Sequence, residues 1–150
     1  MEATLNDEKF ANAASQEAKK SNMQMQHGCV AVRSGKMVAK GCNSYRTYSK
    51  DGMMSGCCSC HAEIDVLRKC MKQSIFNRIN IYIVRVSSKN KYMDSTPCVS
   101  CYHKMKNLFS IKYIIYSTRN GLIKKNFVDF VGSHITSGKK AIMDNRVKLL

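Results

Sequence analysis

A His-x-Glu triplet and a Cys-x-x-Cys pair lie on either side of a strongly apolar segment in this chain. The triplet begins at His61 in "CHAEIDVLRKC", and the pair follows Pro97 in "STPCVSC" as Cys98 and Cys101. The segment between them, "INIYIVRV" at residues 79–86, is mostly β-branched or aromatic, which predicts a central strand covered on both faces. One group of potential metal ligands therefore precedes a buried strand in the sequence, and a second group follows it.

Helical and extended patterns alternate along the chain. Residues 44–60 have no clear period and predict a loop, while residues 122–131 fit either a strand or a helix. The order predicts an α/β fold in a single domain over residues 1–150. The other expected elements are a helix at 7–20 capped by Asn6 or Asp7, a hairpin at 29–41 around Ser34-Gly35, a helix beginning near His61, a helix beginning at Pro97 with Ser95 or Thr96 as its cap, and a strand at 111–117.

This order places the N-termini of the two later helices at the same edge of a sheet. His61 from one helix can then meet Cys98 and Cys101 from the other, which makes three ligands for Zn²⁺. Three protein ligands leave a fourth position for water, as in catalytic rather than structural zinc sites. Glu63 is close to His61 in sequence and is suited to exchanging protons with that water.

"HAE" together with "PCVSC" resembles the signature of the zinc-dependent cytidine and deoxycytidylate deaminase superfamily. The resemblance extends from "HGCVAV" to "KYIIYS" and includes "GCN" at residues 41–43. It implies a three-layer, cytidine-deaminase-like fold in which helices flank a mixed five-stranded sheet. It also implies a zinc-dependent hydrolase, with His61, Cys98 and Cys101 as zinc ligands and Glu63 as the proton shuttle.

The same resemblance suggests residues that contact the substrate. Asn43 matches a residue that contacts the sugar or base, although an Asn here could simply end a strand in a turn. The backbone N–H of Ala62 matches the donor to the base carbonyl. For a nucleotide substrate, we expect one or more of Tyr45, Arg46 and Lys50 to contact the 5′-phosphate, because their loop leaves the strand end beside the zinc edge.

The expected reaction is hydrolysis of cytosine in a (deoxy)cytidine nucleotide, such as dCMP, to uracil and ammonia. The signals for substrate conflict, because "HAEI..LR" is similar to polynucleotide and tRNA deaminases, whereas the long loop is more like that of deoxycytidylate deaminases. Asp65 replaces the Asn that the latter enzymes often have two places after the Glu. A base deaminase acting on RNA, tRNA or single-stranded DNA is the alternative, so adenine stays open beside cytosine. A non-catalytic, zinc-stabilised nucleic-acid-binding protein is a lesser one.

The net charge of +15 favours anionic partners but does not separate a nucleotide from a polymer. Residues 102–150 contain ten Lys or Arg against two acidic residues, and a polymer would spread its phosphates over such side chains. That surface would include Lys124, Lys125, Lys139 and Lys140. A solvated, charged surface is the plainer interpretation.

The N-terminal segment has no apolar core typical of a signal peptide, which predicts a soluble, cytoplasmic protein with no membrane partner. The eight cysteines are then read as metal ligands or buried thiols rather than disulfides. Cys57, Cys58 and Cys60 lie where some nucleotide deaminases hold a second zinc; we favour unliganded thiols. We expect a homo-oligomer, as implied by the family.

Overall fold

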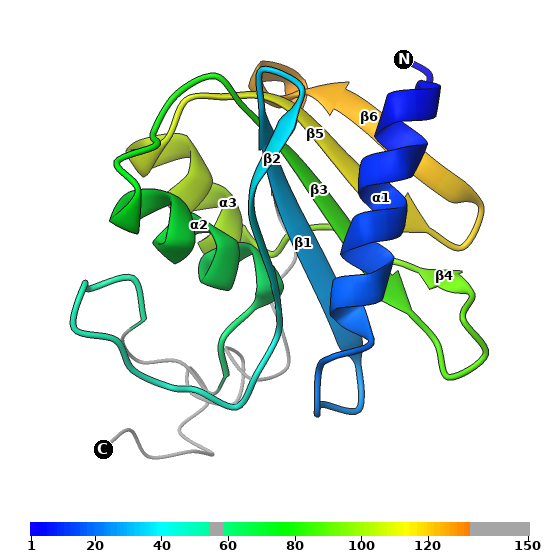
Figure 1. The fold of residues 1–150 in the computed structure, drawn as a ribbon, viewed down its shortest axis with the longest axis horizontal. Helices are drawn as coiled ribbons and strands as arrows, with labels where there is room; N and C mark the ends of the chain where they lie inside the picture. Colours follow the sequence, from blue (N-terminus) through cyan, green and yellow to red (C-terminus); the bar gives the residue numbers. More distant parts are fainter. Residues whose placement is uncertain (55–58, 133–150) are drawn as a thin grey trace.

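A computed structural model describes residues 1–54 and 59–132 of the chain. Its mixed sheet has the strand order β2-β1-β3-β5-β6, and a short additional strand, β4, pairs with β3. Helix α1 covers one face, and α2 and α3 cover the other (Figure 1). The elements are α1 (Leu5–Ala18), β1 (Gln26–Arg33), β2 (Lys36–Cys42), α2 (Ala62–Lys72), β3 (Ile79–Val86), β4 (Tyr92–Met93), α3 (Val99–Leu108), β5 (Ile111–Thr118), β6 (Gly121–Asn126) and a 3-10 turn (Phe127–Asp129).

The predicted three-layer α/β fold is confirmed, and the sheet has one strand more than the five expected. The extra strand, β4, is only two residues long and occurs in a polar segment without an alternating pattern. Residues 122–131, which fitted either a strand or a helix, continue β6 and then form the 3-10 turn. Among the helices of the described residues, none combines the length and apolar composition needed to cross a membrane.

The first helix begins earlier than predicted. Thr4, rather than Asn6 or Asp7, is its N-cap, because Thr4 and Asp7 form a reciprocal capping box. The Thr4 hydroxyl accepts the backbone N–H of Asp7 at 3.1 Å, and the Asp7 carboxylate accepts the backbone N–H of Thr4 at 2.8 Å. Two of the N–H groups at this helix start are thereby satisfied.

The cap of α3, by contrast, was predicted too early. Cys98 is the N-cap, and Ser95, Thr96 and Pro97 all precede the helix. The side chain of Ser95 instead donates to the carbonyl of Ile83, and that of Thr96 donates to Asp94. The two hydroxyls therefore stabilise the segment that leads into α3.

The sheet topology brings the starts of α2 and α3 together. Strands β2 and β3 are both antiparallel to β1, so they run in the same direction and end at the same edge of the sheet. Helix α2 follows β2, and α3 follows β3 before the chain returns to β5, which is parallel to β3. Both helices consequently begin at this edge, as the sequence predicted.

Alternate residues of β1 belong to two separate apolar clusters. Cys29 and Ala31 pack with residues of α2 and α3, whereas Val30 and Val32 pack with α1. Helix α1 passes so close to β1 that a Cβ placed on Gly28 would lie 1.9 Å from the Ala14 carbonyl oxygen. Only glycine permits this contact, which seats α1 directly on the strand.

A buried ionic network joins α1 to the strands beneath it. The Asp7 carboxylate accepts hydrogen bonds from the Tyr82 hydroxyl at 2.7 Å and from the Lys124 ammonium at 2.8 Å. The side chains of Asp7 and Lys124 are 7% and 12% exposed, so water screens their attraction little. Lys124 also lies 4.6 Å from the centre of the Tyr113 ring. Although burial opposes it, the contacts with Lys124, Thr4 and Tyr82 lower the pKa of Asp7.

Replacing Lys124 by Met should destabilise the protein by about 3 kcal/mol, because the Asp7 carboxylate would stay buried without its cation. The exposed neighbour Lys125 provides the control, and Lys125→Met should change stability by less than about 0.5 kcal/mol. Urea unfolding at neutral pH measures both effects.

The pH dependence gives a second check. The lowered pKa of Asp7 means that its contribution is present above the ordinary value of 3.8 and is lost as the pH falls through the lowered value. The difference between wild type and Lys124→Met should therefore shrink in acid. A difference that is independent of pH would contradict the ion pair.

Candidate metal centre

Three side chains from the starts of α2 and α3 form a cluster of metal donors. The ligand atoms of His61, Cys98 and Cys101 all lie within 4.8 Å of one another. The His61 Nδ1 atom is 3.1 Å from the Cys101 sulfur and 3.5 Å from the Cys98 sulfur. The cluster is largely buried, with both sulfur atoms belonging to residues of 5% exposure or less. The structure thus brings together the three residues that the sequence nominated.

The donor set fits zinc. Zinc bonds of about 2.0–2.1 Å to nitrogen and about 2.3 Å to sulfur in a tetrahedron separate the donor atoms by about 3.6 Å. The two nitrogen-to-sulfur distances are close to this value. His61 is the N-cap of α2, but its imidazole makes no capping hydrogen bond to the backbone of the helix start. One imidazole and two sulfur atoms could therefore hold the ion.

The electrostatics of the cluster favour a thiolate at Cys98. A hydrogen bond with the Cys101 thiol lowers the pKa of Cys98 to about 4; burial opposes this shift and His61 adds to it. The backbone N–H of Cys101 also donates to the Cys98 sulfur at 3.5 Å, as expected for an anion at a helix start. The hydrogen bond to Cys98 and burial raise the pKa of Cys101 well above its ordinary value. A metal-binding anion is thus present before any metal enters.

Glu63 is the carboxyl group nearest to the cluster along the chain. It lies in the first turn of α2 and is only 5% exposed. Burial raises its pKa, and the His61 imidazole opposes the shift. A buried carboxyl beside three metal donors can hold or release a proton there without serving as a fourth ligand.

Asn43 is buried at the end of β2, where its side chain holds the neighbouring strand. Its Oδ1 atom accepts the backbone N–H of His27 at 3.0 Å, and its Nδ2 atom donates to the Met25 carbonyl at 2.6 Å. These bonds give Asn43 the strand-ending role that the sequence left open, and one Nδ2 hydrogen is left for another acceptor. Contact with substrate stays a prediction. So does the role of the Ala62 N–H, which has no partner within the helix because Ala62 is its first residue.

Tyr45, Arg46 and Lys50 are all exposed on the loop that leaves β2. The Nε atom of Arg46 donates to the carbonyl of Tyr48 at 2.8 Å, which uses one of its five N–H groups locally. A phosphate contact by any of the three stays a prediction.

The loop expected at residues 44–60 is anchored more firmly than its composition suggested. Met53 and Met54 are almost completely buried in the core shared with α2 and α3. Asp51 pairs with Arg68 of α2 at 2.8 Å, and the Lys104 ammonium of α3 donates to the Met53 carbonyl. Two adjacent methionines in a polar segment were the signal that part of this loop is core.

Two buried serines support the approach to Cys98; the sequence pattern suggested Ser95 only as a helix cap and gave Ser117 no role. The Ser95 hydroxyl lies 3.0 Å from that of Ser117 on β5, and the Ser117 oxygen accepts the backbone N–H of Arg85 at 3.0 Å. The backbone N–H of Ser95 donates to the Ser117 carbonyl at 2.9 Å. These bonds tie the segment just before Pro97 to β3 and β5.

The other cysteines near the centre do not form a second donor group among the described residues. The Cys60 thiol is buried and donates to the His61 carbonyl at 3.5 Å. Burial raises the pKa of Cys60 to about 11, which keeps it a thiol. Cys57 and Cys58 lie outside the described residues, so a second zinc held with them stays untested.

The basic surface that a polymer would use is only partly described. Lys124 is engaged by Asp7 on the α1 side of the sheet, opposite the face on which the metal donors pack. Lys125 is exposed, and Lys139 and Lys140 lie outside the described residues. One of the four lysines considered for phosphate binding therefore has a different partner.

Comparison with known proteins gives a consistent assignment. The family model described as the cytidine and deoxycytidylate deaminase zinc-binding region matches residues 4–118. No curated protein matches the sequence at a significant level. Among solved structures, the fold is similar to cytidine deaminase from Burkholderia pseudomallei, with a TM-score of 0.61 and 18% identity over 81% of this chain and 93% of that chain.

A second similar structure is the dCMP deaminase of cyanophage S-TIM5 in complex with dCMP and dUMP. Its TM-score is 0.55, with 22% identity over 73% of this chain and 78% of that chain. Cytidine deaminase from Mycobacterium tuberculosis has a TM-score of 0.56 and 14% identity, covering 84% and 94% of the two chains. At these identities the likeness concerns the fold alone.

Substituting Cys98 by Ala should abolish stoichiometric zinc binding, because two remaining donors do not hold the ion tightly. The wild type should contain about one zinc per chain by elemental analysis. Cys70→Ala is the matched control. Cys70 is a buried cysteine like Cys98, but it lies on α2 and is not part of the donor cluster. Full zinc occupancy in Cys98→Ala would disprove this ligand assignment.

Proposed function

Because the chain belongs to the family defined by the cytidine and deoxycytidylate deaminase zinc-binding region, we propose that it deaminates cytosine in a (deoxy)cytidine nucleotide. Water replaces the exocyclic amine at C4, so that the nucleotide and water give the uracil nucleotide and ammonia. The observation that carries the proposal is the buried carboxyl of Glu63 at the start of α2, beside the three metal donors. A purely structural zinc site has no use for such a group.

In this proposal His61, Cys98 and Cys101 hold the zinc ion. When bound, zinc acts as a Lewis acid that makes a water molecule a better nucleophile near neutral pH. The Glu63 carboxylate takes a proton from the attacking water and delivers it to the departing amine nitrogen. The raised pKa of Glu63 makes its carboxylate a better acceptor for the water proton, which is the first half of this transfer.

The chain's own backbone positions the base. The free N–H of Ala62 points from the first turn of α2, where helix geometry leaves it without an internal acceptor. It would donate to the pyrimidine O2 atom, while Asn43 would offer its remaining amide hydrogen to the sugar. Tyr45, Arg46 and Lys50 are the contacts for the 5′-phosphate suggested by the sequence.

Glu63→Gln should lower kcat by at least about 10²–10⁴, the usual contribution of general acid–base catalysis, because the amide cannot accept the proton. Zinc content should stay near that of wild type, since Glu63 is not a ligand in this scheme. Turnover near the wild-type rate, with zinc bound, would exclude Glu63 as the shuttle. Loss of zinc together with activity would instead make it a ligand.

A substrate panel tests the proposed reaction directly. The zinc-loaded protein is incubated with CMP, dCMP, cytidine, deoxycytidine, adenosine, tRNA and single-stranded DNA, and the loss of an amine is followed by mass spectrometry. We expect a cytosine mononucleotide to react best. We also expect its turnover to change little between low and moderate salt, since few phosphate charges are involved.

A polymer substrate would give the opposite salt behaviour. Its binding would fall steeply with added salt, with a slope that grows with the number of phosphates contacted. Preferential reaction of tRNA or single-stranded DNA with such a slope would replace the nucleotide proposal by the polymer alternative. Binding of nucleic acid without deamination of any substrate would favour a non-catalytic protein.

A further inference from the structure

His27 and Arg85 are paired across two strands at the edge of the sheet where the metal centre lies. His27 is near the beginning of β1 and Arg85 near the end of β3, and the two are direct partners in the antiparallel register. Paired residues on one face have Cβ atoms about 4.5–5.5 Å apart. Asn43 bonds to the backbone of His27 on its other side. Asn43, His27 and Arg85 therefore lie in one row across the ends of β2, β1 and β3.

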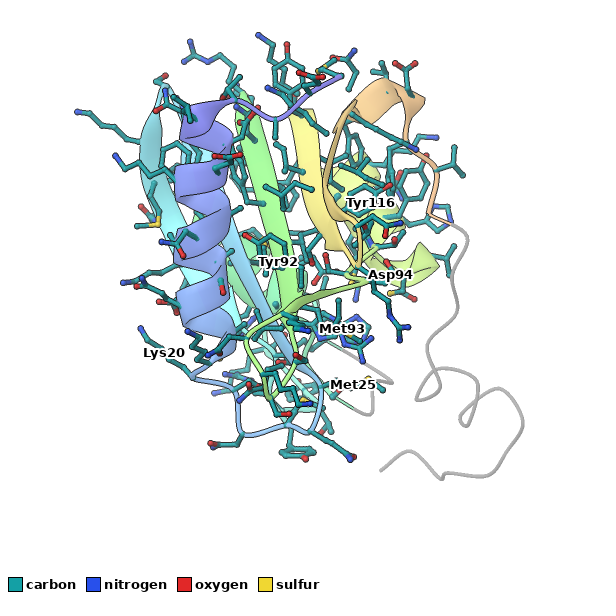
Figure 2. All side chains as sticks on the ribbon, turned by 90° about the vertical axis from the view of Figure 1, so that its right-hand side faces the viewer. Lys20, Met25, Tyr92, Met93, Asp94 and Tyr116 are labelled. Atoms are coloured by element: carbon teal, nitrogen blue, oxygen red, sulfur yellow. The ribbon has the colours of Figure 1, made fainter. Side chains whose placement is uncertain are left out.

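Strand alternation directs both side chains to the face that carries the metal donors. Arg85 alternates with Ile81 and Ile83, and both isoleucines belong to the apolar cluster that contains Cys98 and Cys101. His27 alternates in the same way with Cys29, another member of that cluster. Figure 2 labels Met25, Met93 and Asp94 near this end of the sheet, and Met93 is the β4 partner of Arg85.

The guanidinium of Arg85 is partly buried and has no hydrogen-bond or ion-pair partner within residues 1–54 and 59–132. Its backbone N–H, by contrast, is fixed by Ser117. Arg68 pairs with Asp51 and Arg46 donates to Tyr48, while Arg33, on the same face of β1, lies at the opposite end of that strand. The Asp94 carboxylate follows Met93 and acts on His27, but in the described part of the chain it forms no ion pair with Arg85, so the guanidinium keeps hydrogen-bond donors for an anionic ligand.

His27 does not supply a second positive charge. Burial and the nearby Arg85 lower the pKa of His27 to about 4, so the imidazole is neutral near pH 7. A neutral imidazole offers one donor and one acceptor. The edge thus presents one cation with a neutral polar neighbour, which matches a single terminal phosphate better than a run of backbone phosphates.

We propose that Arg85, with His27 beside it, binds the 5′-phosphate of the nucleotide substrate. The planar guanidinium can give two parallel hydrogen bonds to phosphate oxygens, and partial burial strengthens them. Partial exposure leaves both side chains within reach of a ligand that also meets the metal centre. This assignment rests on the proposed function and moves the phosphate contact from the loop residue Arg46 to the sheet.

The test compares Arg85→Gln with Arg78→Gln, which makes the same chemical change at an exposed residue just before β3. Each variant is made in the Glu63→Gln background, so that calorimetry measures the binding of dCMP and deoxycytidine without turnover. Arg85→Gln should weaken dCMP binding about 10- to 100-fold, as expected for a lost hydrogen bond to a charged group, and leave deoxycytidine binding nearly unchanged. Arg78→Gln should affect neither ligand, and Arg46→Gln is measured beside them as the competing assignment of the phosphate contact.

Kinetics with Glu63 intact provide the second measurement. Arg85→Gln should raise KM for dCMP toward that for deoxycytidine with little change in kcat, and Arg85→Lys should retain part of the preference because it keeps the charge. Thermal melting establishes that the variants are folded. If Arg85→Gln does not fold, the comparison of Arg85→Lys with wild type still decides, because loss of the guanidinium fork should weaken dCMP binding and spare deoxycytidine.

Two results would overturn the assignment. One is an unchanged preference for dCMP over deoxycytidine in folded Arg85 variants, and the other is loss of that preference in Arg46→Gln alone. Failure of the proposed function would look different. Wild-type protein would then bind dCMP through Arg85 without deaminating it.

Discussion

The metal centre depends on two helices that begin at the same edge of one sheet. Strands β2 and β3 run in the same direction because both are antiparallel to β1, so the chain leaves each of them at that edge. His61 is the N-cap of α2, and Cys98 is the N-cap of α3. The partial positive charge of the helix starts favours the Cys98 thiolate, so the topology supplies both the proximity of the donors and part of their electrostatics.

The two faces of the sheet differ in the charged groups that they carry. On one face the ionic network of Asp7, Tyr82 and Lys124 fastens α1, and Gly28 lets the helix approach β1. On the other face Glu63 is buried in the first turn of α2, and the partly buried Arg85 shares the face of Ile81 and Ile83 by strand alternation. Charge on the first face stabilises the fold, whereas the charge of Arg85 on the second is the group proposed to bind a ligand. A net charge of +15 does not reveal this division, because it counts Lys124 and Arg85 alike.

The family assignment and the proposed substrate rest on different observations. The match over residues 4–118 establishes the family, while the solved structures, at 14–22% identity, establish only the fold. The choice of substrate depends on polar groups around the metal centre, and these are distributed over β1, β2, β3 and α2. A nucleotide is proposed from the family match, and the paired state of Lys124 removes one candidate for a polymer surface; the assignment of the phosphate to Arg85 follows from that proposal.

The sequence by itself nominated the donor set and the nearby carboxyl of Glu63 and predicted the alternating order of helices and strands, because spacing and apolar period are local properties. It placed the cap of α1 too late and that of α3 too early, since Thr4 and Cys98 become caps through hydrogen bonds that form only in the folded helix start. It could not assign Arg85 or His27, because their pairing follows from strand register between residues far apart in the chain. Nor could it distinguish Lys124, which pairs with Asp7, from the exposed Lys125, because that difference depends on which side of β6 faces α1.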